Sequence, residues 1–205
     1  RDLRLHDLPA LTAAAEATDG GTVLPLFVLD PTLLRGAGAA RLGALRDALT
    51  RAQADYDGAI VIRTGDPATV LPQVVEEAGA ASVHVSGEST PYGRRRGKAV
   101  MTTVGDVPVI SAGTPYAVSP GQIRTQAGEP YQVFTPFSRA WRDHGWPAPA
   151  GAPANLAVAH LESDREAWSF VDDALSVEGL PPLPEPGEAA ALRKWREFLD
   201  GELAA

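Results

Sequence analysis

Short runs of β-forming residues that alternate with alanine-rich helical stretches constrain the fold of this chain more than any other feature. The runs lie at residues 23–29, 59–63, 82–86 and 107–111, and they are continuous and rich in Val, Ile and Leu. Continuous apolar strands are typical of parallel sheets with helices on both faces. Strands that alternate with helices indicate βαβ units. The pattern therefore predicts a doubly wound, Rossmann-like α/β domain with three layers.

The segments between the runs are expected to form helices at residues 8–18, 39–55, 67–78 and 92–104. The third of these helices has the clearest ends. Asp66-Pro67 has the form of an N-cap followed by a proline in the first turn, and Gly79 stands where a C-cap belongs. These capping residues predict where that helix begins and ends.

The ends of the strands are the expected functional edge, because ligands of doubly wound sheets bind there, beside the point where the strand order reverses. Three segments follow strands in this way: Asp30-Pro31, Thr64-Gly65-Asp66 and Ser86-Gly87-Glu88. The sequence has neither G-x-G-x-x-G after a strand nor G-x-x-x-x-G-K-[ST]. No motif therefore supports a dinucleotide site or a P-loop nucleotide site.

Net charge and cysteine content exclude several classes of function. The 205-residue chain has no cysteine, which excludes disulfides and thiolate catalysis and suits a reducing, cytoplasmic environment. Its formal net charge is −8, the wrong sign for a domain that mainly holds a phosphate backbone. No apolar run approaches the roughly 18 to 20 residues that cross a bilayer, so no membrane partner is expected.

Catalytic and metal-binding patterns are absent from the sequence. The four histidines are scattered without a Glu or His at metal-ligand spacing, and no G-x-S-x-G motif occurs. We therefore predict binding features and no catalytic or metal-ligating residue. Arg94–Arg96 and Lys98 place four positive charges within five positions, a pattern that by itself indicates a solvated helix face.

The character of the chain changes after about residue 147. Pro147–Pro153 has the composition of a linker, and residues 180–187 contain four more prolines. Two modest helices are expected around residues 163–175 and 188–203, the second with apolar side chains at helical spacing that require a partner surface. We therefore place the α/β domain at residues 1–140 and a linker with transition helices at residues 141–205.

Four segments match one protein family in order and spacing. They are Arg1–Leu11 (RDLRLHDLPAL), Leu26–Pro31 (LFVLDP), Pro91–Arg96 (PYGRRR) and Tyr131–Trp141 (YQVFTPFSRAW). Together they resemble the N-terminal α/β domain of the DNA photolyase and cryptochrome family, in particular that of class I-type cyclobutane pyrimidine dimer photolyases. Leu8 replaces the family's usual asparagine, and Gly97 its usual aspartate.

The resemblance implies light-driven repair of cyclobutane pyrimidine dimers by a carbon–carbon lyase, a flavoprotein that transfers an electron from reduced FAD to a flipped-out dimer. No segment resembles the helical FAD domain, so this chain alone is expected to be inactive and to bind a light-harvesting antenna. The implied partners are that FAD domain and, through the full-length protein, damaged DNA. The family's first strand precedes the RDLR motif, and the expectation is that this strand is missing here.

The resemblance also implies a chromophore site at the strand ends. The residues that match those around a tricyclic ring are Arg1, Phe27, Asp30, Arg41 and Glu88. Phe27 offers an apolar face, and Asp30 and Glu88 can accept hydrogen bonds from ring or ribityl donors. The folate-binding branch has an Asn-Glu pair where this chain has Tyr92-Gly93, which favours a deazaflavin or FMN over folate.

Alternatives remain open from the sequence. Asp30 could instead cap the turn before Pro31, with Glu88 solvated. At the level of function, the alternatives are a cryptochrome-like blue-light photoreceptor and a stand-alone nucleotide- or flavin-binding α/β module. Arg94–Arg96 are expected at a helix start, in contact with the chromophore loop or the FAD domain and with DNA as a minor partner. The aromatic segment at residues 131–141 is expected to be a wedge at the domain interface.

Overall fold

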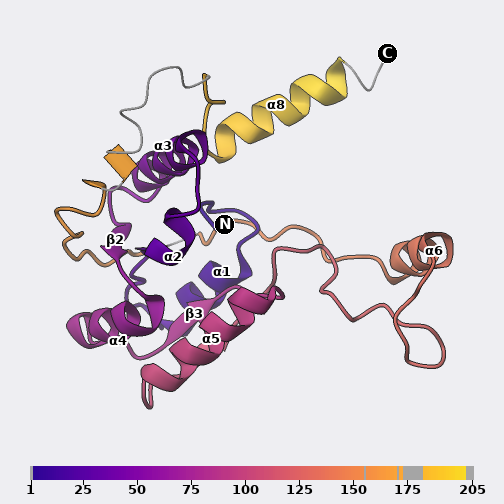
Figure 1. Cartoon of the computed structure of the whole chain (residues 1–205), viewed down its shortest axis with the longest axis horizontal. Helices are drawn as coiled ribbons and strands as arrows, with labels where there is room; N and C mark the ends of the chain where they lie inside the picture. Colours follow the sequence, from indigo (N-terminus) through magenta and orange to yellow (C-terminus); the bar gives the residue numbers. More distant parts are fainter. Residues whose placement is uncertain (1, 155, 170, 173–181, 202–205) are drawn as a thin grey trace.

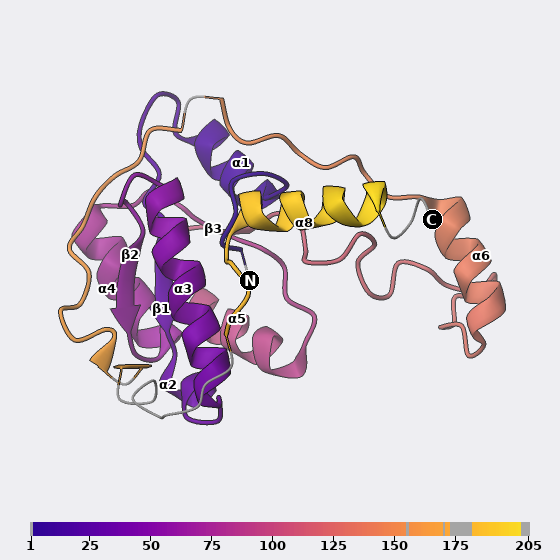
Figure 2. The same ribbon diagram turned by 90° about the horizontal axis from the view of Figure 1, so that it is seen from above.

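The computed structural model describes residues 2–154, 156–169, 171–172 and 182–201. Its elements in chain order are α1 (Pro9–Ala17), β1 (Leu26–Leu29), α2 (Pro31–Leu34), α3 (Ala39–Asp55), β2 (Val61–Thr64), α4 (Pro67–Ala78), β3 (Val83–Val85), α5 (Pro91–Thr103), β4 (Val109–Ser111), α6 (Phe134–His144) and α8 (Glu188–Asp200). Strands and helices alternate from β1 to β4, as predicted, and β2 lies between α3 and α4 (Figures 1 and 2). The α/β fold class is confirmed.

The strands form two parallel pairs. β1 pairs with β2, from Leu26 opposite Val61 to Leu29 opposite Thr64, and β3 pairs with β4. These pairs are two separate two-stranded sheets, and in the described residues no strand is hydrogen-bonded between β1 and β3. β1 and β3 therefore belong to two different two-stranded sheets, called the two half-sheets below.

The first strand is shorter than the predicted run at residues 23–29, because it begins at Leu26. Pro25 has no N–H to donate, which ends regular pairing on that side. Its carbonyl still accepts from the Val61 N–H at 2.8 Å, while Val23 forms an isolated parallel bridge with Val158. The segment before the proline thus pairs with the later part of the chain.

Helices begin and end at capping residues where the sequence supplies them. The Asp66 carboxylate accepts from the Ala68 N–H at 2.9 Å, and Gly79 ends α4 with a φ of 59°, which is the left-handed conformation that glycine adopts readily. Both predicted caps of α4 are confirmed. At α1 the N-cap is Leu8, which makes no side-chain cap.

Two apolar clusters stabilise the two half-sheets. The larger cluster includes Leu29, Leu42, Leu49 and Ile62 from β1, α3 and β2, all at most 2% exposed. The smaller cluster joins α4 to α5 with partly buried residues of β3 and β4 around it. Full burial of one such side chain stabilises the fold by about 1.5–3 kcal/mol. Each pair of strands therefore has its own core.

The described residues between 150 and 172 contact the α/β body at several points. The Asp7 N–H donates to the Ala150 carbonyl at 2.7 Å, and the Ile62 N–H donates to Ser163 Oγ at 2.9 Å. Val171, farther along, is fully buried. The segment predicted as a linker thus covers one edge of β2. The boundary at residue 140 stays a prediction, because a segment that packs on one domain can still lead to another.

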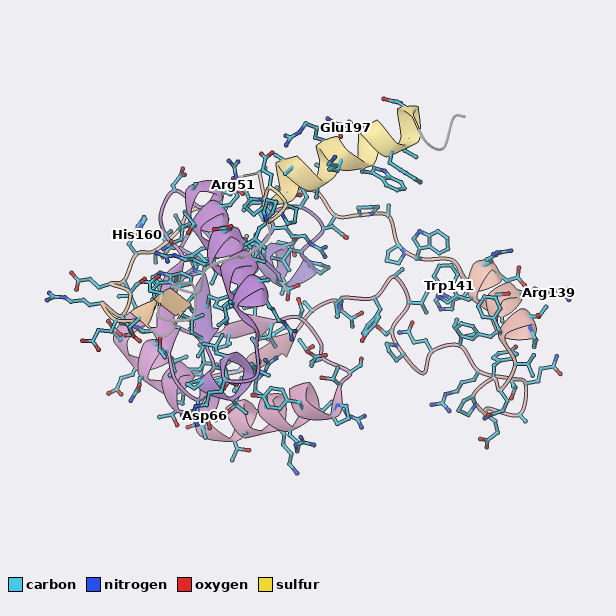
Figure 3. All side chains as sticks on the ribbon, turned by 45° about the horizontal axis from the view of Figure 1, so that its top comes forward. Arg51, Asp66, Arg139, Trp141, His160 and Glu197 are labelled. Carbon is cyan, nitrogen blue, oxygen red and sulfur yellow. The ribbon has the colours of Figure 1, made fainter. Side chains whose placement is uncertain are left out.

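Two helices stand at the periphery. Figure 1 shows α6 at the end of a long excursion, away from the strands, and α8 extending outward from the end of α3. Arg51, labelled in Figure 3, marks the junction of α3 and α8, because a Cβ at Gly187 would lie 2.5 Å from Arg51 Cγ. α8 corresponds to the predicted helix at residues 188–203, of which 202–203 lie outside the described residues.

For the other predicted helix in the tail, at residues 163–175, positions 170 and 173–175 also lie outside the described residues. No helix in the described part is long and apolar enough to cross a membrane.

Candidate functional site

Asp30 follows β1 directly and is the N-cap of α2. Its side chain is buried, with the residue 5% exposed, and its Oδ1 accepts from the Thr32 N–H at 2.8 Å. Its Oδ2 accepts a hydrogen bond from the Tyr92 hydroxyl. A buried carboxylate is costly unless hydrogen bonds compensate for lost water, and these two contacts do so. Asp30 therefore does cap the turn before Pro31, one of the two roles that the sequence left open.

Glu88 follows β3 and occupies the space beside the first turn of α5. Its Oε1 accepts from the Ser89 and Thr90 N–H groups at 3.0 and 3.3 Å. Its side chain lies so close to Gly93 that a Cβ there would be 1.6 Å from Glu88 Cγ. Thr90 caps the same helix, because its Oγ1 accepts from the Gly93 N–H at 3.1 Å. Any side chain at position 93 would thus force the Glu88 side chain to move.

Tyr92 connects the two strand ends. It belongs to the first turn of α5, after β3, yet its hydroxyl donates to Asp30 at the end of β1. That hydrogen bond raises the pKa of Tyr92, with burial and the charge of Asp30 as further causes. The Arg96 guanidinium lies over the Tyr92 ring, 5.9 Å from its centroid, within the range of a cation–π interaction.

The other predicted site residues are spread over different elements. Phe27 on β1 is partly buried and packs against the larger core, and Arg41 is exposed in the first turn of α3. Arg1 lies outside the described residues. The first turn of α5 contacts both Asp30 and Glu88, the first through Tyr92 and the second through Gly93.

Sequence reasoning missed the role of Tyr92, which it considered only as a position lacking the folate pair. The available signal was a tyrosine in the loop-to-helix segment after a strand, because a tyrosine hydroxyl that becomes buried usually finds a hydrogen-bond partner. Arg94–Arg96 lie near the start of α5, as predicted, with Arg94 and Arg95 exposed. Their contact with a chromophore loop or an FAD domain stays a prediction.

A third strand end, after β2, has a different character. Arg63 pairs with Glu77 at 2.7 Å and with Asp164 at 3.3 Å, and the Thr64 N–H donates to Asp164 at 2.7 Å. The hollow that these residues line measures about 190 Å³, below the roughly 300 Å³ of ordinary ligand pockets. Its charges are already compensated, so it is a structural contact between β2, α4 and the tail.

Within the described ranges, no three His, Cys, Asp or Glu side chains are grouped so that they could hold a metal ion. His6 lies 2.9 Å from a Glu188 carboxylate oxygen, and His84 contacts the Ser82 hydroxyl at 3.0 Å. Both histidines thus make structural contacts.

The fold and its strand-end side chains define a class: a doubly wound α/β domain, in which ligands bind at the carboxyl ends of the strands. The family model described as DNA photolyase matches residues 1–154. The chain therefore belongs to the DNA photolyase family. It is 34% identical to a deoxyribodipyrimidine photo-lyase of Halobacterium salinarum, over 98% of this chain and 44% of that relative. It thus spans less than half the length of this relative.

Solved structures support the same fold. A Synechocystis cryptochrome superposes with a TM-score of 0.78 at 17% identity, over 98% of this chain and 45% of that one. An archaeal photolyase from Sulfolobus tokodaii, determined with two FAD molecules and described as implying a novel light-harvesting cofactor, superposes with a TM-score of 0.74 at 18% identity. That match covers 94% of this chain and 44% of the archaeal one.

Proposed function

We propose that this chain binds a light-harvesting chromophore at the carboxyl ends of β1 and β3 and passes the excitation to FAD in a helical domain of the same protein. The complete protein is then a deoxyribodipyrimidine photo-lyase that splits cyclobutane pyrimidine dimers in DNA under light. The observation that carries this proposal is the family match over residues 1–154, which includes both strand ends. The chain without FAD is expected to leave dimers intact.

Asp30 suits a ligand that carries hydrogen-bond donors. A carboxylate offers about four acceptor positions, and its described contacts come from Thr32 and Tyr92. Acceptor capacity therefore remains for a ring or ribityl donor, with Phe27 as an apolar contributor from the same strand. A deazaflavin or FMN fits these groups, and when bound it absorbs light and supplies excitation energy to FAD.

The first turn of α5 argues against folate. The folate pair would require a carboxylate at position 93, but that position is a glycine whose space is taken by Glu88. The Tyr92 hydroxyl is polar, but it is directed to Asp30. A pterin would not find that Asn-Glu pair on the first turn of α5, and each of its donors buried without an acceptor would cost about 1–3 kcal/mol.

The exposed aromatic residues of α6 and α8 are the proposed contact with the FAD domain. Phe134 at the start of α6 is 76% exposed, and Trp195 on α8 is 55% exposed and stacked on Phe198. Figure 3 shows Trp141 and Arg139 on α6, far from the helices around the strands. Exposed apolar surface of this kind marks an interaction site. The acidic net charge of −8 implies that the rest of the protein holds most of the DNA.

Ligand titration tests the proposal. The protein with its FAD domain is titrated with a deazaflavin, FMN and methenyl-folate, and energy transfer is followed as FAD-sensitised emission. We expect transfer from a deazaflavin or FMN, and dimer repair in blue light but not in the dark. Tight folate binding without any response to the two flavin-type ligands would refute the ligand assignment.

A photoreceptor is the second candidate, because the chain shares its fold with the Synechocystis cryptochrome. The repair assay separates the two functions. Light-dependent FAD reduction without any loss of dimers would favour signalling over repair. Tight binding of a nucleotide or flavin by this chain, with no effect of an FAD domain on the bound ligand, would favour a stand-alone binding module.

A further inference from the structure

A side-chain hydrogen bond from Tyr92 to Asp30 links the segment that follows β1 to the segment that follows β3. The partners are 62 residues apart and come from different strand pairs. This bond lies at the position where a doubly wound sheet places its ligand. Tyr92 therefore acts where the proposed chromophore must enter.

Both ends of this hydrogen bond are held in place. On one side, Asp30 Oδ1 is fixed by the Thr32 N–H, so the carboxylate has one oxygen in the cap of α2 and the other toward Tyr92. On the other side, the Thr90 cap and the packing of Glu88 on Gly93 fix the first turn of α5. The Tyr92 hydroxyl thus sets the orientation of the Asp30 carboxylate.

From this arrangement we propose that Tyr92 is a positioning residue, which holds the Asp30 carboxylate ready to accept a hydrogen bond from a flavin-type ring. The inference rests on the function proposed above. An acceptor that is already oriented loses less conformational freedom when the ligand binds, so part of the affinity comes from Tyr92 without direct contact. Arg96, over the tyrosine ring, helps to keep that ring in place.

Four variants of the full chain test this, with FMN and a deazaflavin as the probes. Tyr92→Phe removes the hydroxyl and keeps the ring, and Tyr116→Phe is the control, because Tyr116 is 43% exposed and its described hydrogen bonds are made by its backbone. Asp30→Asn keeps a side chain that can cap α2, and the fourth variant combines it with Tyr92→Phe. Thermal unfolding of each variant shows whether it folds.

We expect Tyr92→Phe to weaken binding by about tenfold, close to the value of one hydrogen bond, and Tyr116→Phe to leave it unchanged. In the Asp30→Asn background, Tyr92→Phe should change affinity little, because the two residues act as a unit. Additive losses, unchanged affinity or tighter binding in Tyr92→Phe would overturn the inference while leaving the function intact. If neither the wild-type chain nor the control binds either probe, the inference and the proposed ligand fail together.

Discussion

Gly93→Ala offers a direct test of the packing at the β3 end. A methyl group at this position would lie 1.6 Å from Glu88 Cγ and 2.5 Å from Glu88 Cδ, so the glutamate must move. It then gives up its hydrogen bonds to the Ser89 and Thr90 N–H groups. Such bonds to a charged group contribute about 1.5–3 kcal/mol each, part of which water restores.

The higher helix propensity of alanine partly offsets this loss of stability. Alanine is more favourable than glycine inside a helix by about 1 kcal/mol. Two hydrogen bonds are lost, while alanine's helix propensity and the rehydration of Glu88 recover part of their contribution. We therefore expect Gly93→Ala to lower the free energy of unfolding by about 2 kcal/mol.

The same helix provides the control. Gly97 also lies within α5, but a Cβ there would meet nothing within 4 Å. Gly97→Ala should therefore stabilise the chain by about 1 kcal/mol, the propensity gain alone. Urea unfolding of both variants measures the difference. A double change of Gly93 and Glu88 to alanine should be more stable than Glu88→Ala alone. Equal stabilities of Gly93→Ala and Gly97→Ala would refute the packing argument.

Two further predictions concern the edge of β2 and a buried phenol. Asp164→Ala leaves the Thr64 N–H and one side of Arg63 without their partner, so urea unfolding should show a loss of about 1–3 kcal/mol, whereas the exposed Glu162→Ala should stay within about 0.5 kcal/mol of wild type. Burial, with smaller effects of nearby carboxylates, raises the pKa of Tyr56 from 10.0 to about 12. Since the folded-state pKa is the higher one, stability from the protonated phenol is present below pH 10 and is lost as pH rises toward 12. Absorbance titration should show a late phenol that Tyr56→Phe lacks, and an unchanged late phase in that variant would contradict the assignment.

The fold class and several element ends could be predicted because their causes are local. Alternation of apolar strands with helices depends on residues within a few turns of one another, and so do the caps of α4 at Asp66 and Gly79. The turn role of Asp30 is local too, since its cap involves Thr32, two residues away. The family motifs are also short stretches of sequence, so they could be recognised without the structure.

Tertiary structure alone decided how the site is assembled. Tyr92 meets Asp30 across 62 positions, and Asp164 meets Thr64 across 100. No periodicity or spacing encodes such pairs, because they depend on how the strand pairs and the tail pack in space. The role of Gly93 is similar, since it is set by the close approach of Glu88 and not by backbone conformation. Sequence thus determined most elements of the α/β body and the family of this protein, whereas packing between distant segments determined which side chains meet at the strand ends.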